Sequence, residues 1–174
     1  MFMSCPIPSS RLNDYCHQLS DLMRTASARV DQMDASIEED QGFSVSVRQG
    51  QLETCESQGN KKLVITVYKN KKTGTASTTD LSVSAMEMAL DKAIAIASFT
   101  ESDPCAGLVN AELMAQHIPD LKQCHEWSID QSQATALALA CDEQVLAYDS
   151  HMVAREGTEV STSQGLYAYA NTHG

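Results

Sequence analysis

The 174-residue sequence has few aromatic residues, few glycines and prolines, and few basic residues. Aromatic side chains make up 5% of the chain, and there are only eight glycines and four prolines. With 43% hydrophobic residues, the composition excludes a collagen-like, low-complexity or wholly disordered chain. Aliphatic residues, alanine and methionine must therefore fill the core.

Basic residues are outnumbered, with 12 Lys and Arg against 23 Asp and Glu and a net charge of −11. Direct binding to nucleic acid needs a basic face that displaces counterions from the phosphates. An acidic chain lacks that driving force, so we expect no nucleic-acid partner.

Long hydrophobic runs are also missing. The runs at residues 93–97 and 136–141 are far shorter than the ~20 residues that span a bilayer. The first residues lack the basic and apolar regions of a signal peptide. We therefore predict a cytoplasmic protein with no membrane contact. The six cysteines form no Cys-x-x-Cys pair, which favours free thiols over a zinc ribbon or a thioredoxin-like site.

Apolar periodicity predicts several helices. The spacing of Leu12, Cys16, Leu19 and the apolar residues after them predicts a helix over residues 10–33. Possible capping boxes at residues 84–87 and 128–131 predict helices to about residue 99 and residue 148. In the last helix the predicted inward residues are Ala134, Leu137, Cys141, Val145 and Tyr148. A short helix is expected at residues 111–116.

Alternating or β-branched segments predict strands at residues 43–48, 52–57, 63–68 and 75–78, joined by three tight turns. A further hairpin is expected from residues 152–161 and 166–170. This order predicts an α+β fold, an antiparallel β-meander with helices packed on one face in a two-layer sandwich. We expect residues 1–10 to form a flexible tail and residues 11–174 to form the domain.

Five places in the sequence carry residue types used in catalysis or metal binding. His125-Glu126 lacks the second histidine that a zinc-peptidase helix requires. Cys124 beside His125, or Cys105 after Pro104, could serve a thiol hydrolase, but no spacing supplies an orienting partner. His173 stands alone, and the acids at residues 38–40 do not match an EF-hand. We therefore assign no catalytic, cofactor-binding or metal-binding residue, and a binding module is favoured over an enzyme.

Four segments resemble the TldD/PmbA family. They are residues 42–54, residues 65–68 followed by Gly-Thr-Ala-Ser-Thr-Thr-Asp-Leu-Ser at 74–82, residues 99–108, and Glu156-Gly157 with residues 171–174. The second and third are similar to the PmbA (TldE) branch in particular. Lys62 and Cys105 depart from the family pattern.

The resemblance implies the N-terminal domain of a two-domain protein. It implies a cytoplasmic bacterial zinc metallopeptidase complex that trims a microcin leader and degrades small or unfolded proteins, and a family name as a modulator of DNA gyrase. It also implies a dimer with a TldD-type subunit or with itself. Zinc is expected only in the TldD-type partner, because Asp130 stands where the zinc motif would need its second histidine. The alternative is a stand-alone regulatory protein-binding module.

Overall fold

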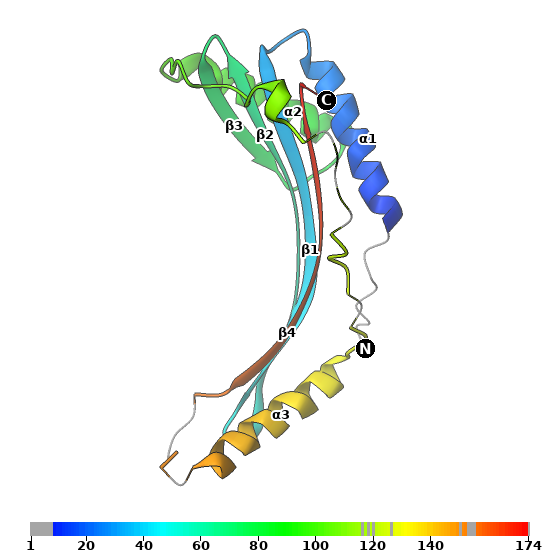
Figure 1. Cartoon of the computed structure of the whole chain (residues 1–174), viewed down its shortest axis with the longest axis vertical. Helices are drawn as coiled ribbons and strands as arrows, with labels where there is room; N and C mark the ends of the chain where they lie inside the picture. Colours follow the sequence, from blue (N-terminus) through cyan, green and yellow to red (C-terminus); the bar gives the residue numbers. More distant parts are fainter. Residues whose placement is uncertain are drawn as a thin grey trace. The chain divides into compact units, whose positions relative to one another are not determined.

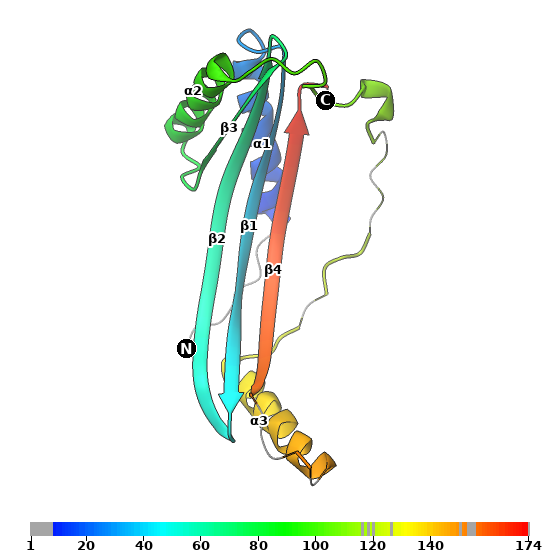
Figure 2. The same ribbon diagram turned by 90° about the vertical axis from the view of Figure 1, so that its left-hand side faces the viewer.

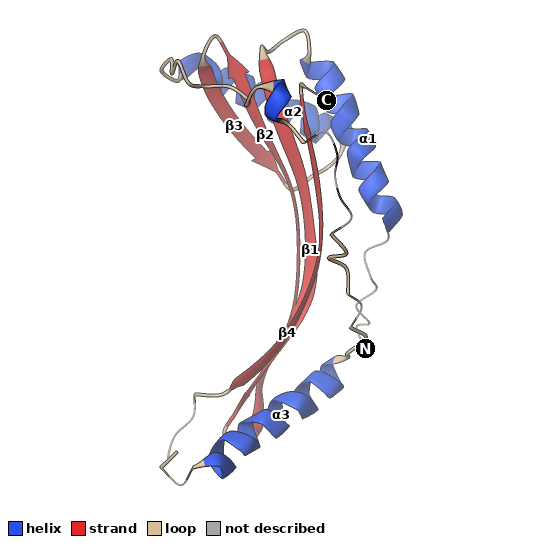
Figure 3. Cartoon of the chain, viewed as in Figure 1, coloured by secondary structure: helices blue, strands red, loops and turns tan. Residues whose placement is uncertain are grey.

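The computed structural model describes residues 9–115, 117, 119, 121–125, 127–149, 151–152 and 156–173. Its elements, in chain order, are α1 (Ser9–Ala26), β1 (Gln32–Arg48), β2 (Gln51–Lys69), β3 (Lys72–Thr78), α2 (Val83–Phe99), a 3-10 turn (Ala111–Leu113), α3 (Gln131–Tyr148) and β4 (Thr158–Asn171) (Figures 1 and 3). Most of the predicted tail lies outside the described residues, and the predicted domain of residues 11–174 stays a prediction.

The four strands form one sheet in the order β3-β2-β1-β4. β2 and β3 are antiparallel, with Val67 opposite Gly74 and Leu63 opposite Thr78. Helices pack against this antiparallel sheet, so the predicted α+β fold is confirmed.

The chain divides into two compact units. The hairpin unit comprises residues 1–6, 40–59 and 121–164, and the two-helix unit comprises residues 7–39, 60–120 and 165–174. β1, β2 and β4 contribute residues to both units. Each unit has a hydrophobic core of its own.

In the two-helix unit, every second residue of β1 and β2 is buried beneath α1 and α2. The buried residues are Met33, Ala35, Ile37, Leu63, Ile65, Val67 and Ala168 from the strands, and Tyr15, Leu19, Leu22, Ala26, Met86, Ala89, Leu90, Ala93 and Ala97 from the helices. Gly74 of β3 lies directly against α2, since a Cβ atom there would stand 2.1 Å from the Ala93 carbonyl oxygen. The absence of a side chain at Gly74 therefore sets how closely α2 approaches the sheet.

In the hairpin unit, α3 covers Phe43, Val45 and Val47 of β1 with the small residues Ala134 and Ala138. The helix begins with a capping box, in which the Asp130 carboxylate and the Gln133 side chain each accept a backbone N–H. Asp142, buried on the same side of α3, accepts the N–H of Gly50 at 2.8 Å. This hydrogen bond ties the β1–β2 turn to the helix.

Two tight turns join the first three strands. Gln49 and Gly50 have φ angles of 53° and 75°, and Asn70 and Lys71 have 53° and 60°. Positive φ at both central residues is typical of the turns whose twist matches that of a β-hairpin. Asp31 accepts the N–H of Asn70 and so supports the second turn.

The turn predicted at residues 58–60 is wrong, because β2 runs through these residues without a break. The predicted final hairpin is wrong in the same way, since residues 163–165 lie inside β4. Residues 153–155 of that predicted hairpin lie outside the described part. Both segments are polar or glycine-containing, but pairing with a neighbouring strand holds their backbones extended.

The predicted helix over residues 10–33 ends seven residues early, and β1 begins at Gln32. The burial of Met33, Ala35 and Ile37 has the period of two that marks a strand. Cys16 is exposed, whereas Tyr15 and Leu22 face the core.

The other two helices start elsewhere than predicted. α2 is capped by Ser82, whose hydroxyl accepts the N–H of Ala85, and Val83 is exposed. α3 buries Ala134, Ala138 and Asp142, while Leu137, Cys141, Val145 and Tyr148 of the predicted inward stripe are exposed. Apolar and polar residues are both spread around this helix, so its sequence does not single out one face.

Candidate functional site

The sheet of the two-helix unit has a second face, opposite α1 and α2. Figure 2 looks onto it, with β2, β1 and β4 in front of α1. Residues between the buried positions of each strand point to this side, because successive side chains alternate. They include Asp34 of β1, Tyr68 of β2, and Tyr167 and Tyr169 of β4.

Asp34 is the centre of a small polar cluster on this face. The Tyr68 hydroxyl hydrogen-bonds to the Asp34 carboxylate. Tyr169 lies close enough to feel the charge of Asp34 and shares a side-chain hydrogen bond with Asn171. The amide of Asn171 is buried and also contacts the sulfur of Met114 at 3.9 Å. The ends of β1, β2 and β4 thus meet in one network.

Burial dominates the electrostatics of this cluster. It raises the pKa of Asp34, and the hydrogen bond from Tyr68 opposes that rise. Burial and, after it, the charge of Asp34 raise the pKa of Tyr68 and of Tyr169. In the part of the chain that the structure describes, no lysine or arginine forms an ion pair with Asp34.

A pocket of about 260 Å³ in the same unit is lined by Gln32, residues 108–112 and His173. The Gln32 side-chain oxygen accepts the N–H of Leu108 at 2.8 Å. Gly107 approaches the same oxygen with a φ of 150°, which only glycine adopts readily. The lining includes one carboxylate, Glu112, and one imidazole, His173.

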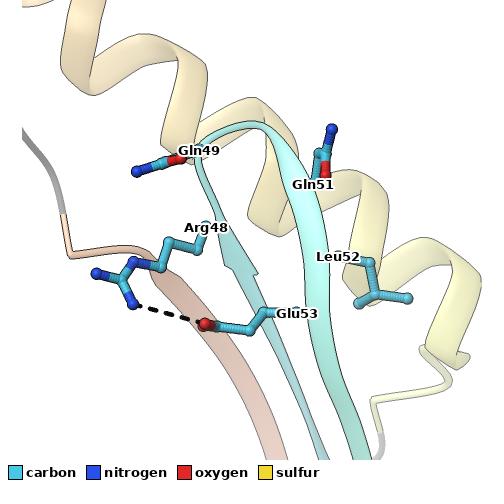
Figure 4. Close-up of a pocket in the computed structure, with 5 residues that line it drawn as sticks. All are labelled: Arg48, Gln49, Gln51, Leu52 and Glu53. Carbon is cyan, nitrogen blue, oxygen red and sulfur yellow. Dashed lines mark ion pairs between the residues drawn. The ribbon is translucent and has the colours of Figure 1, made fainter.

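A second pocket, of about 310 Å³, lies at the β1–β2 turn of the hairpin unit (Figure 4). Arg48 and Glu53 form an ion pair at 3.6 Å across its opening. Gln49, Gln51 and Leu52 complete the lining. The one carboxylate of the lining, Glu53, is engaged by Arg48, and the other side chains offer no nucleophile or general base, so the pocket suggests no chemistry.

Among the described residues, those considered in the sequence form no catalytic group. Cys105, Cys124 and His125 are exposed, and Glu126 lies outside the described residues. His173 is exposed and donates its N–H to the Asn171 side chain. In the described part of the chain, no hydrogen bond joins a cysteine thiol to a histidine ring.

The acids at residues 38–40 are part of β1 and not a turn. Glu39 accepts hydrogen bonds from Arg11, at 2.5 Å, and from Tyr15, so its carboxylate ties α1 to β1. Among the described residues there is no group of three or more His, Cys, Asp or Glu side chains that could hold a metal ion. The donor set for the zinc that the resemblance implies is not assembled in this part of the chain.

Sequence reasoning missed Asp34, Tyr68 and Tyr169 as a cluster. The signal was present as polar and aromatic residues alternating with the core residues of three strands. This alternation becomes informative only when residues 32–42 are recognised as a strand, because that strand places Asp34 between Tyr68 and Tyr169.

Comparison with known proteins gives the context of these sites. Residues 33–97 match the family described as PmbA/TldA metallopeptidase domain 1. The chain is 33% identical to metalloprotease PmbA of Escherichia coli O157:H7 over 156 residues, 90% of this chain and 35% of the relative. It is 39% identical to a PmbA homologue of Haemophilus influenzae over 133 residues, 76% of this chain and 30% of the relative. The chain belongs to the PmbA/TldD family.

Solved structures have the same fold. TldE from Thermococcus kodakarensis matches with a TM-score of 0.68 at 15% identity, over 90% of this chain and 35% of that one. A Bacteroides thetaiotaomicron protein, described as a candidate modulator of DNA gyrase, matches with a TM-score of 0.73 at 14% identity, over 91% and 36%. The chain thus spans about a third of the length of the relatives it matches. None of its described helices is long and apolar enough to cross a membrane.

Proposed function

We propose that this chain is the first domain of a PmbA/TldE-like, non-catalytic subunit of a zinc metallopeptidase complex. The observation that carries the proposal is the 33% identity to metalloprotease PmbA over 90% of the chain. Zinc is expected in a TldD-type partner, as the family resemblance implies. The complex would act in the cytoplasm on microcin leaders and on small or unfolded proteins, as the family resemblance implies.

In this proposal the domain contacts peptides through strand edges. β3 pairs with β2 only from Leu63 to Lys69, and no described strand lies beside residues 51–62 on that side. Unpaired N–H and C=O groups at a strand edge can accept an extended peptide as an additional strand. The edge would bind any extended sequence, because main-chain groups make the contacts.

The test is co-purification of the tagged chain with the TldD-type subunit of the same organism. We expect the two to elute together, with the TldD-type subunit binding zinc. A chain that elutes alone or only as a homodimer would contradict a docking role for this domain. It would favour the stand-alone regulatory binding module. Activity of the chain alone that disappears on thiol alkylation would instead favour a thiol hydrolase.

A further inference from the structure

In the part of the chain that the structure describes, the Asp34 carboxylate accepts a hydrogen bond from the phenol of Tyr68. It is half-buried in the middle strands of the sheet, between Tyr68 of β2 and Tyr169 of β4. No described lysine or arginine forms an ion pair with it. A partly desolvated charge without a counter-ion lowers the stability of a fold, so a bound cation would compensate it.

The groups around Asp34 suit a particular cation. Tyr167 and Tyr169 remain 59% and 49% exposed on the same strand face, and Tyr68 stands on the opposite side of Asp34. Phenol rings attract cations over their faces and offer flat surfaces for stacking. A guanidinium group is planar, stacks on aromatic rings and binds carboxylates through two parallel hydrogen bonds, whereas an ammonium group does neither as well.

We propose that Asp34, Tyr68 and Tyr169 bind the guanidinium group of an arginine side chain carried by an extended peptide. Charge complementarity decides the occupant, since the site presents one carboxylate without a basic partner on a chain of net charge −11. A second copy of this chain would bring the same excess of negative charge. The choice of a peptide rests on the proposed function, and the site adds to the strand edge a preference for basic residues.

The test is a nuclear magnetic resonance titration of the isotope-labelled chain. The probe is a capped heptapeptide of serine and threonine with one central arginine, and the matched probes carry lysine or the uncharged analogue citrulline. At low ionic strength we expect the amide signals of Asp34, Tyr68 and Tyr169 to shift with the arginine peptide. The shifts should be weaker with lysine and absent with citrulline.

Two matched variants isolate the charge of Asp34. Asp34→Asn removes the carboxylate but keeps an oxygen for the Tyr68 hydroxyl, and we expect binding to weaken by about tenfold or more, which corresponds to the loss of a charged hydrogen-bonded pair. Glu38→Gln makes the same charge change four residues further along β1, on the same face, where the side chain is exposed. It should leave binding unchanged within about twofold.

Two variants at Tyr169 separate the ring from its hydroxyl. Tyr169→Phe keeps the ring face and should retain most of the affinity, whereas Tyr169→Leu should lose several-fold. The proposal is overturned if Asp34→Asn binds as the parent chain does, if citrulline binds equally well, or if the shifts map elsewhere. Shifts of the same residues on raising the protein concentration alone would assign the face to self-association and also overturn it. The readout needs neither a partner subunit nor peptidase activity, so either proposal can fail while the other holds.

Discussion

At the scale of single residues, Asp34 opposes stability at neutral pH. Burial raises its pKa in the folded chain, so the ionised form is favoured less there than in the unfolded chain. The loss of stability is therefore absent below the pKa of the unfolded chain, where the carboxyl group is protonated in both states. It develops as the pH rises through the raised pKa of the folded chain. Tyr68 and Tyr169 are the titratable groups that face it from β2 and β4, and both are neutral in this range.

We predict that Asp34→Asn makes the chain slightly more stable at pH 7. The gain should be on the order of a few tenths of a kcal/mol, because solvent screens a half-exposed carboxylate. It should vanish near pH 3, where the parent carboxyl group is protonated in both states. Urea unfolding at both pH values measures this, with Glu38→Gln as the control. A loss of stability at pH 7 would show that Asp34 is a structural residue and not an uncompensated charge.

Tyr15, in contrast to Asp34, stabilises the fold at neutral pH. It is buried between α1 and β1, and its hydroxyl donates to Glu39. Burial, followed by the hydrogen bond to Glu39, raises its pKa from 10.0 to about 12. The stabilisation that Tyr15 provides should therefore be complete below about pH 10 and lost as the pH rises toward 12.

We predict that Tyr15→Phe lowers the free energy of unfolding by about 1.5–3 kcal/mol at pH 8, the range for a hydrogen bond to a charged group. The difference from the parent chain should shrink above pH 10. Unfolding curves across this range, together with phenol absorbance, measure both effects. Tyr148→Phe, at a residue that is 85% exposed, should change nothing. A difference that persists at pH 12 would contradict the assignment.

At the scale of elements, the close contact between α2 and β3 depends on one glycine. A Cβ atom at Gly74 would lie 2.1 Å from the Ala93 carbonyl oxygen and 2.4 Å from the Ala97 nitrogen. Both are backbone atoms of the helix, so no side-chain rotation can relieve the overlap. At Gly59 of β2 the nearest such atom, the Asp40 carbonyl oxygen, is 3.8 Å away.

We predict that Gly74→Ala destabilises the chain by about 2–3 kcal/mol, because α2 must move away from the sheet. Gly59→Ala should be neutral or slightly stabilising, since alanine loses less conformational freedom than glycine on folding. Thermal unfolding of the two variants side by side makes the comparison. Equal effects would mean that α2 can shift without loss of packing.

Elements with a clear internal pattern were predictable, and those held by their neighbours were not. The turns at residues 49–50 and 70–71, the strand of residues 63–68 and the end of α2 were all predicted from local sequence. Residues 38–42, 58–60 and 163–165 look like turns by composition, yet they lie inside β1, β2 and β4. Hydrogen bonds from adjacent strands outweigh these weak local preferences.

At the scale of the whole molecule, the two units have cores of different size. Counted over the described residues, the two-helix unit buries sixteen core residues from helices and strands, and the hairpin unit buries six. Two of those six are alanines, which bury little apolar area. Less buried apolar surface means that local opening requires less free energy.

We predict that backbone amides of the hairpin unit exchange with solvent at least about tenfold faster than those of the two-helix unit. Val45 and Val47 represent the first unit, and Ile37 and Ile65 the second, all within strands and fully buried. Hydrogen-exchange mass spectrometry with peptide-level resolution measures the difference. Equal protection in both units would show that they open only as one cooperative body.

The sequence by itself determined the fold class and the family. Composition and periodicity sufficed for the α+β class, because a strand or helix with one buried face carries apolar residues at a characteristic spacing. The family was visible in four short segments, since turns, caps and strand ends constrain which residues they accept.

Only the tertiary structure decided how long the strands are, which faces of the helices are buried, and which polar residues meet. Asp34, Tyr68 and Tyr169 are far apart in the sequence and become neighbours because β2, β1 and β4 are adjacent in the sheet. Strand order depends on the balance of all the packing contacts in the fold, and no local pattern carries it. The candidate binding site was therefore invisible until the strands were paired.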